Sequence, residues 1–145
     1  MKHIFTVIIV FFLFCPVSVF AETNEISAKD MAKKWFEKGL KYDIDKDYDK
    51  AIEAFTKAIA LKPDYAYAYT NRGFAYYNNG QYDRAIEDYD KAIALDPNDA
   101  EAYNNRGVAY GVKGNMDRAI SDYKKACDMG NELGCRNLHE VLQNR

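Results

Sequence analysis

Few residues in this chain of 145 could carry chemistry, and they fall into three groups. The tripeptide Asn-Arg-Gly occurs at residues 71–73 and again at 105–107. Cys127 and Cys135 lie eight residues apart, and residues 43–47 alternate acidic side chains with Ile and Lys. Amides can hold a peptide backbone, thiols can form a disulfide or bind metal, and alternating carboxylates can bind calcium.

Metal binding and catalysis find little support. Residues 43–47 lack the central glycine and the closing glutamate of a calcium loop, so a solvated helix end and turn is the simpler interpretation. A zinc site needs about four ligands, whereas His139 and two cysteines are the only Cys and His residues outside the first 21. No nucleophile elbow, Cys-x-x-Cys or phosphate-binding glycine motif is present. We expect no enzyme activity and no cofactor, and His139 is expected at the surface.

The charge balance argues against a nucleic-acid partner. The chain holds 20 Lys and Arg against 22 Asp and Glu, and no basic block could follow a phosphate backbone. We therefore expect no nucleic-acid partner.

Residues 1–21 have the pattern of a secretory signal peptide. Lys2 and His3 precede an apolar run over residues 4–14, followed by Pro16 and by Ala21 at the expected cleavage site. We predict cleavage after Ala21 and export to the periplasm or the extracellular space.

Two alternatives would place the chain at a membrane. Residues 4–21 are about long enough for an uncleaved anchor, although Pro16 disfavours a clean span. Cys15 could be lipidated, although Phe14 is bulky where lipoprotein signals carry a small residue. Membrane association is expected only in these cases.

The remaining sequence repeats with a period of 34 residues. Residues 66–99 and 100–133 are identical at 17 of 34 positions, and the register extends more weakly to 32–65. Such a period indicates a solenoid. Aromatic residues recur at the fourth, eleventh and twenty-fourth positions of each unit: Trp35, Tyr69, Tyr103; Tyr42, Tyr76, Tyr110; Phe55, Tyr89, Tyr123. Small residues recur at the eighth, twentieth and twenty-seventh: Gly39, Gly73, Gly107; Ala51, Ala85, Ala119; Ala58, Ala92, Ala126.

These positions predict two antiparallel helices per unit. Small residues allow the helices to approach closely, and the aromatic rings fill the space between those contacts. Gly80 and Gly114 stand where the first helix of a unit should end in a left-handed turn. Pro63 and Pro97 stand near the end of a unit, because proline cannot continue a helix.

The pattern resembles the tetratricopeptide repeat family. The resemblance implies an all-α solenoid of three helix-turn-helix units, residues 32–65, 66–99 and 100–133, followed by a capping helix over 134–145. Residues 22–31 form a polar lead-in that either frays or extends the first helix. The chain departs from the family pattern at three positions: Lys46 replaces a turn glycine, Met116 an aromatic residue and Asn131 a proline. The tightness of the first turn and the end of the third unit are therefore open.

The family resemblance also implies a concave groove that binds a peptide or a partner protein. The groove residues, assigned from the family's positions, are Phe36, Leu40, Tyr67, Thr70, Asn71, Phe74, Tyr77, Asn78, Asn104, Asn105 and Val108.

Asn71 and Asn105 are the strongest candidates among them. An amide both donates and accepts, so it can hold an extended backbone without reading sequence, although these amides could instead cap neighbouring turns. The basic residues with which some family members clamp a terminal carboxylate are absent. Because Glu37, Asp43 and Glu101 outweigh Lys33 on the same face, we expect a neutral or mildly basic partner.

Arg72 and Arg106 occupy the seventh position of their repeat units, directly after the groove residues Asn71 and Asn105 in the sequence. Asp88 and Asp122 lie at matching places in the second helices, so interhelix pairing is the expected role, with direct ligand contact as the alternative.

Cys127 and Cys135 resemble the Cys-x7-Cys pair of cysteine-rich bacterial relatives of this repeat. An exported chain would form the corresponding disulfide, which would hold the capping helix. The alternative is that each thiol packs as a small hydrophobic group.

The sequence as a whole predicts an exported protein-interaction module, an adaptor or assembly factor. The alternative is a structural subunit that self-associates through its repeat ends.

Overall fold

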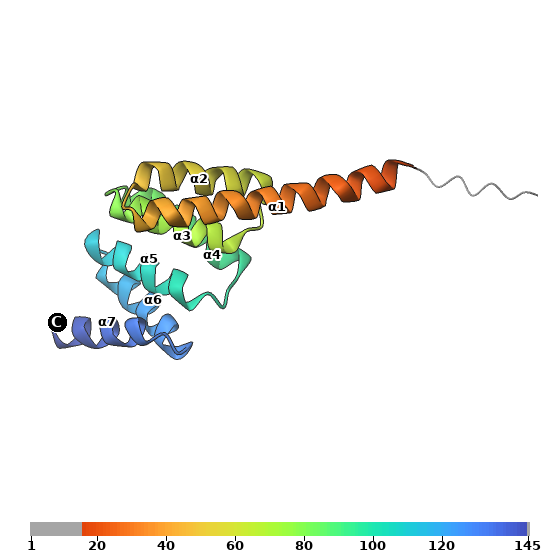
Figure 1. Cartoon of the computed structure of the whole chain (residues 1–145). Coiled ribbons are helices and arrows are strands. Elements are labelled where there is room, and N and C mark those ends of the chain that lie inside the picture. Colours follow the sequence, from red (N-terminus) through yellow and green to blue (C-terminus); the bar gives the residue numbers. More distant parts are fainter. Residues whose placement is uncertain (1–15, 145) are drawn as a thin grey trace, which may run out of the picture.

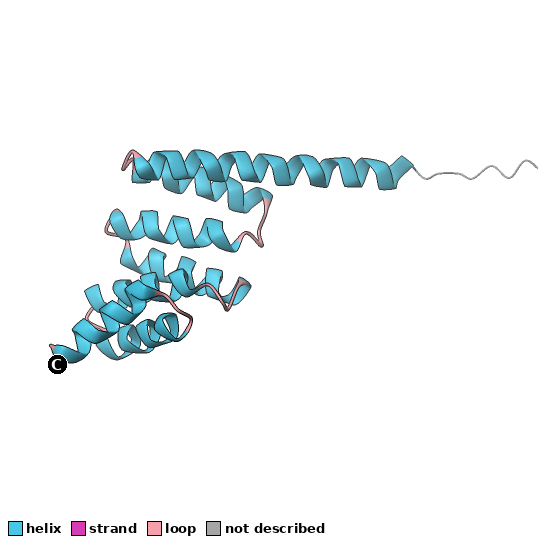
Figure 2. Cartoon of the chain, turned by 60° about the horizontal axis from the view of Figure 1, so that its bottom comes forward, coloured by secondary structure: helices cyan, strands magenta, loops and turns pink. Residues whose placement is uncertain are grey.

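The computed structural model describes residues 16–144, and within them the chain forms seven α-helices and no strand (Figure 2). The helices are α1 (Pro16–Ile44), α2 (Tyr48–Leu61), α3 (Ala66–Asn78), α4 (Tyr82–Leu95), α5 (Ala100–Val112), α6 (Met116–Asp128) and α7 (Glu132–Gln143). The all-α architecture predicted from the 34-residue period is confirmed.

The helices stack in chain order along one axis (Figure 1). Within a unit, α1 packs on α2, α3 on α4 and α5 on α6, and the second helix of each unit also contacts the first helix of the next. The last helix, α7, packs on α6. Helices α2 to α6 therefore each bury one face within their unit and another against a neighbouring helix of the stack, as a solenoid requires.

The core is built from one large ring and one glycine per unit. The rings of Phe55, Tyr89 and Tyr123 are buried against Gly39, Gly73 and Gly107. A Cβ atom on Gly73 would lie 2.8 Å from Cε1 of Tyr89, closer than side-chain atoms pack. Buried alanines at the twentieth and twenty-seventh positions complete the contact between the two helices, as the pattern predicted.

The turns inside the units share one backbone conformation. Gly80 and Gly114 have φ of 76° and 78°, in the left-handed region that glycine adopts without strain. Lys46 takes the same place with φ 58°, and the N–H of Asp47 donates to the carbonyl of Tyr42 at 2.9 Å. The first turn therefore closes like the others although it lacks the glycine.

The first helix is longer than its unit and extends beyond α2 (Figure 1). It is described from Pro16 onward and continues through residues 22–31, so the lead-in extends the first helix. The predicted signal peptide lies mainly in residues 1–15, which are outside the described residues, as is Cys15. Among the described helices, none combines the length and the apolar character that a membrane span needs.

The capping helix begins two residues earlier than the repeat register predicts. Gly130 adopts φ of 85° and ends α6, and the Asn131 side chain accepts a hydrogen bond from the N–H of Gly134 at 2.7 Å. An asparagine N-cap thus stands where the other units carry proline. Leu138 and Val141 of α7 are half-buried, whereas Leu142 is 53% exposed.

Candidate binding groove

The candidate site lies on the face formed by the first helices of the units, α1, α3 and α5; we call it the groove face. Its centre is an apolar hollow of about 160 Å³ between the second and third units. Phe74 and Tyr77 of α3 form one wall, Asn105 and Val108 of α5 form the other, and the buried ring of Tyr89 closes the hollow from α4. Four of the predicted groove residues thus line one cavity.

Asn71 and Asn105 occupy equivalent positions on α3 and α5, and both are half-buried. Asn71 Nδ2 donates to the carbonyl of Tyr67 at 2.7 Å, which leaves its oxygen as an acceptor. Asn105 Oδ1 accepts from Nδ2 of Asn104 at 3.2 Å, which leaves its amide hydrogens as donors. The two side chains together offer one acceptor and one donor, the complement of a peptide unit.

Two predicted groove residues lie inside the stack instead. Thr70 is 3% exposed and its hydroxyl donates to Asp99 Oδ2 at 2.8 Å. Asn104 is 4% exposed and its oxygen accepts from Nδ2 of Asn137 at 2.9 Å. Asp99 begins α5 and Asn137 belongs to α7, so both contacts join one unit to the next helix of the stack. Thr70 and Asn104 stand at the fifth position of their units and connect each unit to the next helix; we call such contacts between units seams. Both side chains are buried and therefore not available to a ligand.

Phe36 and Leu40 have a similar role in the first unit. Both pack against the core cluster around Phe55, and the ring of Phe36 lies 5.6 Å from that of Phe55 and 4.9 Å from that of Tyr65. The two side chains are half-buried, so they support the groove face more than they present an open surface.

The remaining predicted residues form the accessible part of the groove face. Tyr67 is 62% exposed, and Phe74 is also exposed. The exposed Asn78 donates from Nδ2 to the carbonyl of Phe74 at 3.0 Å, and the Tyr77 ring packs at 5.4 Å from the ring of Tyr82. Burial raises the pKa of the Tyr77 phenol, so this hydroxyl stays protonated and can donate to a ligand.

Acidic side chains influence the phenol of Tyr89, the residue that closes the hollow. Burial raises the pKa of the Tyr89 phenol, and the nearby carboxylates of Glu101 and Asp43 raise it further. Burial also raises the pKa of Asp43, whose Oδ1 is buried and makes no hydrogen bond within the described residues. Lys33 is the one basic residue predicted on this face, and its Nζ lies 3.9 Å from Oε1 of Glu37.

The two arginines form the predicted interhelix pairs. Arg72 donates from Nε and Nη2 to the Asp88 carboxylate, both at 2.7 Å, and Arg106 donates in the same way to Asp122, both at 2.8 Å. The hydrogen bonding of the Arg106 guanidinium to the Asp122 carboxylate, which accepts, is the main reason why the pKa of Arg106 is raised. Both arginines belong to the seams and not to the groove face.

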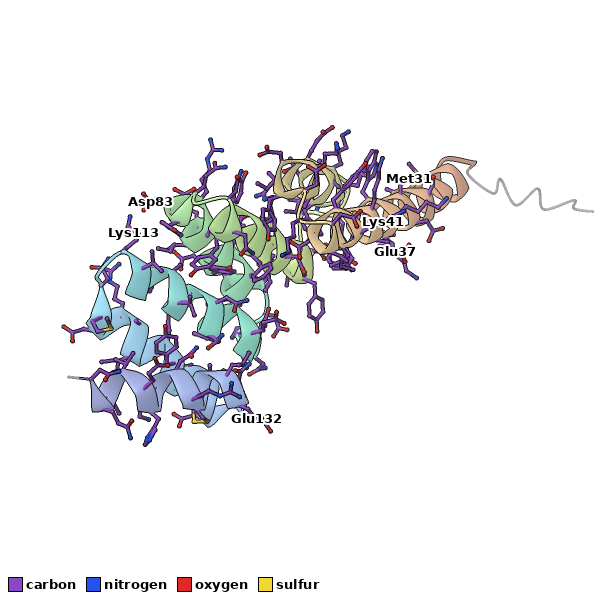
Figure 3. All side chains as sticks on the ribbon, turned by 60° about the vertical axis from the view of Figure 1, so that its left-hand side comes forward. Met31, Glu37, Lys41, Asp83, Lys113 and Glu132 are labelled. Carbon is purple, nitrogen blue, oxygen red and sulfur yellow. A yellow bond between two sulfur atoms is a disulfide. The ribbon has the colours of Figure 1, made fainter. Side chains whose placement is uncertain are left out.

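A second set of seam contacts was not foreseen from the sequence. Lys113 at the end of α5 forms an ion pair with Asp83 at the start of α4, and the two side chains meet at one edge of the stack (Figure 3). One unit earlier, Asn79 Nδ2 donates to Asp49 Oδ1 at 2.9 Å. Each pair is separated by 30 residues, so the repeat register contained the signal as polar residues at the fourteenth and eighteenth positions.

The two late cysteines are bonded in the structure. Cys127 of α6 and Cys135 of α7 form a disulfide with their Cα atoms 4.5 Å apart. The described residues contain no group of three or more His, Cys, Asp or Glu side chains placed to hold a metal ion. His139 is exposed, as expected, and its Nε2 lies 2.7 Å from Nε2 of Gln143.

Solved structures similar to this chain are tetratricopeptide repeat (TPR) domains. The first TPR of Spaghetti (RPAP3) bound to the HSP90 peptide SRMEEVD is 29% identical, with a TM-score of 0.76 over 80% of this chain and 94% of that one. The first TPR domain of human RPAP3 is 30% identical, with a TM-score of 0.75 over 78% and 91%. The second human RPAP3 domain, in complex with the HSP70 peptide SGPTIEEVD, is 26% identical, with a TM-score of 0.72 over 81% and 97%.

Family models match most of the repeat array. A TPR repeat model matches residues 39–80 and 75–114, and a tetratricopeptide repeat model matches residues 100–129. No curated protein sequence matches the chain. The matches cover more than half of the 145 residues and coincide with the stacked helix pairs, so the chain belongs to the tetratricopeptide repeat family.

Proposed function

We propose that this chain is an exported protein-interaction module that binds an extended peptide or a segment of a partner protein along the groove face. The hollow between α3 and α5 is the main support, because apolar walls stand there beside Asn105, whose amide hydrogens remain available. Apolar anchoring next to a few oriented polar groups is the usual composition of a peptide site.

Similar domains support a peptide as the ligand. The first TPR of Spaghetti and the second TPR domain of human RPAP3 are described as complexes with the peptides SRMEEVD and SGPTIEEVD. Both peptides end in Glu-Glu-Val-Asp. The groove face of this chain carries Glu37, Asp43 and Glu101 against Lys33, so an acidic peptide would meet like charge. We therefore propose a neutral or mildly basic partner.

A pull-down from an envelope extract tests the proposal. Wild-type protein should retain one or more partners that Asn71→Ala/Asn105→Ala loses, because the double variant lacks both the free acceptor and the free donor. Asn98→Ala, in the exposed turn before α5, is the matched control and should retain them. Equal recovery of every partner by all three proteins would remove the groove face from the proposal.

Export is proposed from the sequence pattern of residues 1–21. Cleavage after Ala21 would remove residues 16–21 from α1 and leave a helix over residues 22–44 in front of α2. Mass spectrometry of the protein purified from cell fractions should give a mature chain that begins at Glu22. An intact chain in the membrane fraction, or a lipid on Cys15, would contradict cleavage after Ala21.

Self-association is a second candidate, favoured by apolar exposure on the last helix. Leu133 and Leu142 of α7 are 52% and 53% exposed. If ends of the stack join, light scattering across a concentration series should show a rising mass that Leu133→Gln/Leu142→Gln abolishes. A constant monomer mass would leave the peptide-binding module as the remaining proposal.

A further inference from the structure

We propose that the first unit contains a binding site for an Asp or Glu side chain of a partner protein, in a cavity between α1 and α2 where Lys38 lies beside two aromatic rings. None of the predicted groove residues lines this cavity. The inference therefore goes beyond the peptide-binding function proposed above and does not rest on it.

All three units place a cation against two aromatic rings at the same positions of the repeat. Nζ of Lys38 lies 4.9 Å from the centre of the Trp35 ring and 5.7 Å from that of the Tyr42 ring. In the other units the cation is Arg72 or Arg106, whose Cζ lies between 5.5 and 5.9 Å from the two equivalent rings. The first unit thus builds the same cation–ring arrangement as the others.

The first unit lacks the carboxylate that completes this arrangement in the other two. There, each arginine donates two hydrogen bonds to the acid at the twenty-third position, Asp88 or Asp122. Ala54 occupies this position in the first unit and is buried. No ion pair in the described part of the chain includes Lys38. The comparison between units therefore identifies the missing group as a carboxylate.

The cavity beside Lys38 has room for that group. It measures about 250 Å³, and Trp35, Tyr42 and Ala54 form part of its wall. A water molecule occupies roughly 30 Å³ in the liquid, so the cavity can hold a carboxylate together with its first carbon atoms. Asp122 lines the corresponding cavity of the third unit, where the chain supplies the carboxylate itself.

The charge of the cavity favours an anion. Lys50 and Lys57 line it together with Lys38. Lys57 is paired with Glu53 at 2.6 Å and Lys50 with Asp47 at 2.5 Å, so Lys38 is the cation of the lining without an acidic partner. A carboxylate placed beside it would gain a charge-assisted hydrogen bond, and the aromatic walls would strengthen the attraction by excluding part of the solvent.

Tryptophan fluorescence tests the site directly, because Trp35 is the only tryptophan of the chain and lines the cavity. The wild-type protein is titrated at constant ionic strength with a capped tripeptide that has Asp at its centre, with the same tripeptide carrying Asn, and with inorganic phosphate. We expect a saturable change of emission with the Asp peptide. The Asn peptide should bind at least about tenfold more weakly, the usual effect of losing a charge-assisted hydrogen bond. Phosphate should also bind more weakly, because the other two units hold a planar carboxylate at this place.

Variants then assign the signal to the cavity. Ala54→Asp should abolish binding of the Asp peptide, because its own carboxylate would pair with Lys38 as the acids of the other units pair with their arginines. Lys38→Gln should weaken binding about tenfold. Lys41→Gln removes the same charge at an exposed position of α1 (Figure 3) and should bind like wild type. Thermal melts report whether each variant folds, and Lys38→Gln decides the question if Ala54→Asp does not fold.

Each contrary outcome is distinct. A folded Ala54→Asp variant that binds the Asp peptide like wild type would overturn the site. Equal losses in Lys38→Gln and Lys41→Gln would do the same, because net charge would then explain the signal. A change of emission that never saturates, or that the Asp and Asn peptides share, would also overturn it, and tighter binding of phosphate would overturn the assignment to a carboxylate. None of these results bears on the groove face, which Asn71→Ala/Asn105→Ala tests separately.

Discussion

Arg106 binds Asp122 through two parallel hydrogen bonds and reaches Asp90 with a third at 2.6 Å. The three residues belong to α5, α6 and α4, so a single guanidinium joins both helices of the third unit to the second unit. Arg72 repeats the arrangement with Asp88 and with Thr56 of α2. The paired Asn-Arg-Gly segments therefore combine a seam residue, the arginine, with a groove residue, the asparagine.

Replacing Arg72 by Met should lower the free energy of unfolding by about 3 kcal/mol, because the buried Asp88 would lose its partner. Urea denaturation measures the effect. Arg84→Met, at an exposed position on α4, should change the stability by less than about 0.5 kcal/mol. Unchanged denaturation together with lost peptide binding would reassign Arg72 to the ligand site.

Gly73→Ala should lower the free energy of unfolding by about 1–2 kcal/mol, because the added Cβ would overlap the Tyr89 ring. Gly111→Ala is the matched control, since its Cβ would lie 3.6 Å from the Tyr123 hydroxyl, an ordinary contact. That change should raise stability by about 0.5–1 kcal/mol through helix propensity. Equal effects at the two glycines would contradict the close approach of α3 and α4.

Removing the disulfide with Cys127→Ala/Cys135→Ala should lower the free energy of unfolding by about 2–3 kcal/mol, because the bond closes a short loop and holds α7 on α6. A thiol assay on unreduced, denatured protein should find neither cysteine reactive. Two reactive thiols would show that the bond does not form in the purified protein.

Asp43→Asn should raise the melting temperature at pH 7. Burial raises the pKa of Asp43 in the folded chain, so ionisation above the unfolded pKa near 3.8 favours the unfolded state. The gain from the Asn variant should therefore shrink as pH falls toward 3, where both states are protonated. Melting curves of wild type and Asp43→Asn between pH 3 and 7 measure this gain. A difference in melting temperature that does not change with pH would exclude ionisation of the Asp43 carboxyl as its cause.

The repeat sequence by itself determined the helices, their order and the core. Gly73, Tyr89 and the alanines at the twentieth and twenty-seventh positions are fixed within one unit, so a 34-residue period is sufficient to predict their packing. The Arg72–Asp88 pair was predictable for the same reason, since both residues belong to one helix pair.

Only the tertiary structure decided which side chains remain available on the groove face. Thr70 and Asn104 share the family's groove position, but each is buried by a polar residue of the following helix, Asp99 or Asn137. The unpaired oxygen of Asp43 likewise depends on how tightly α1 packs on its neighbours. Such contacts between units depend on which residue the next unit presents and on the rotation between units, and a repeat pattern read one unit at a time specifies neither.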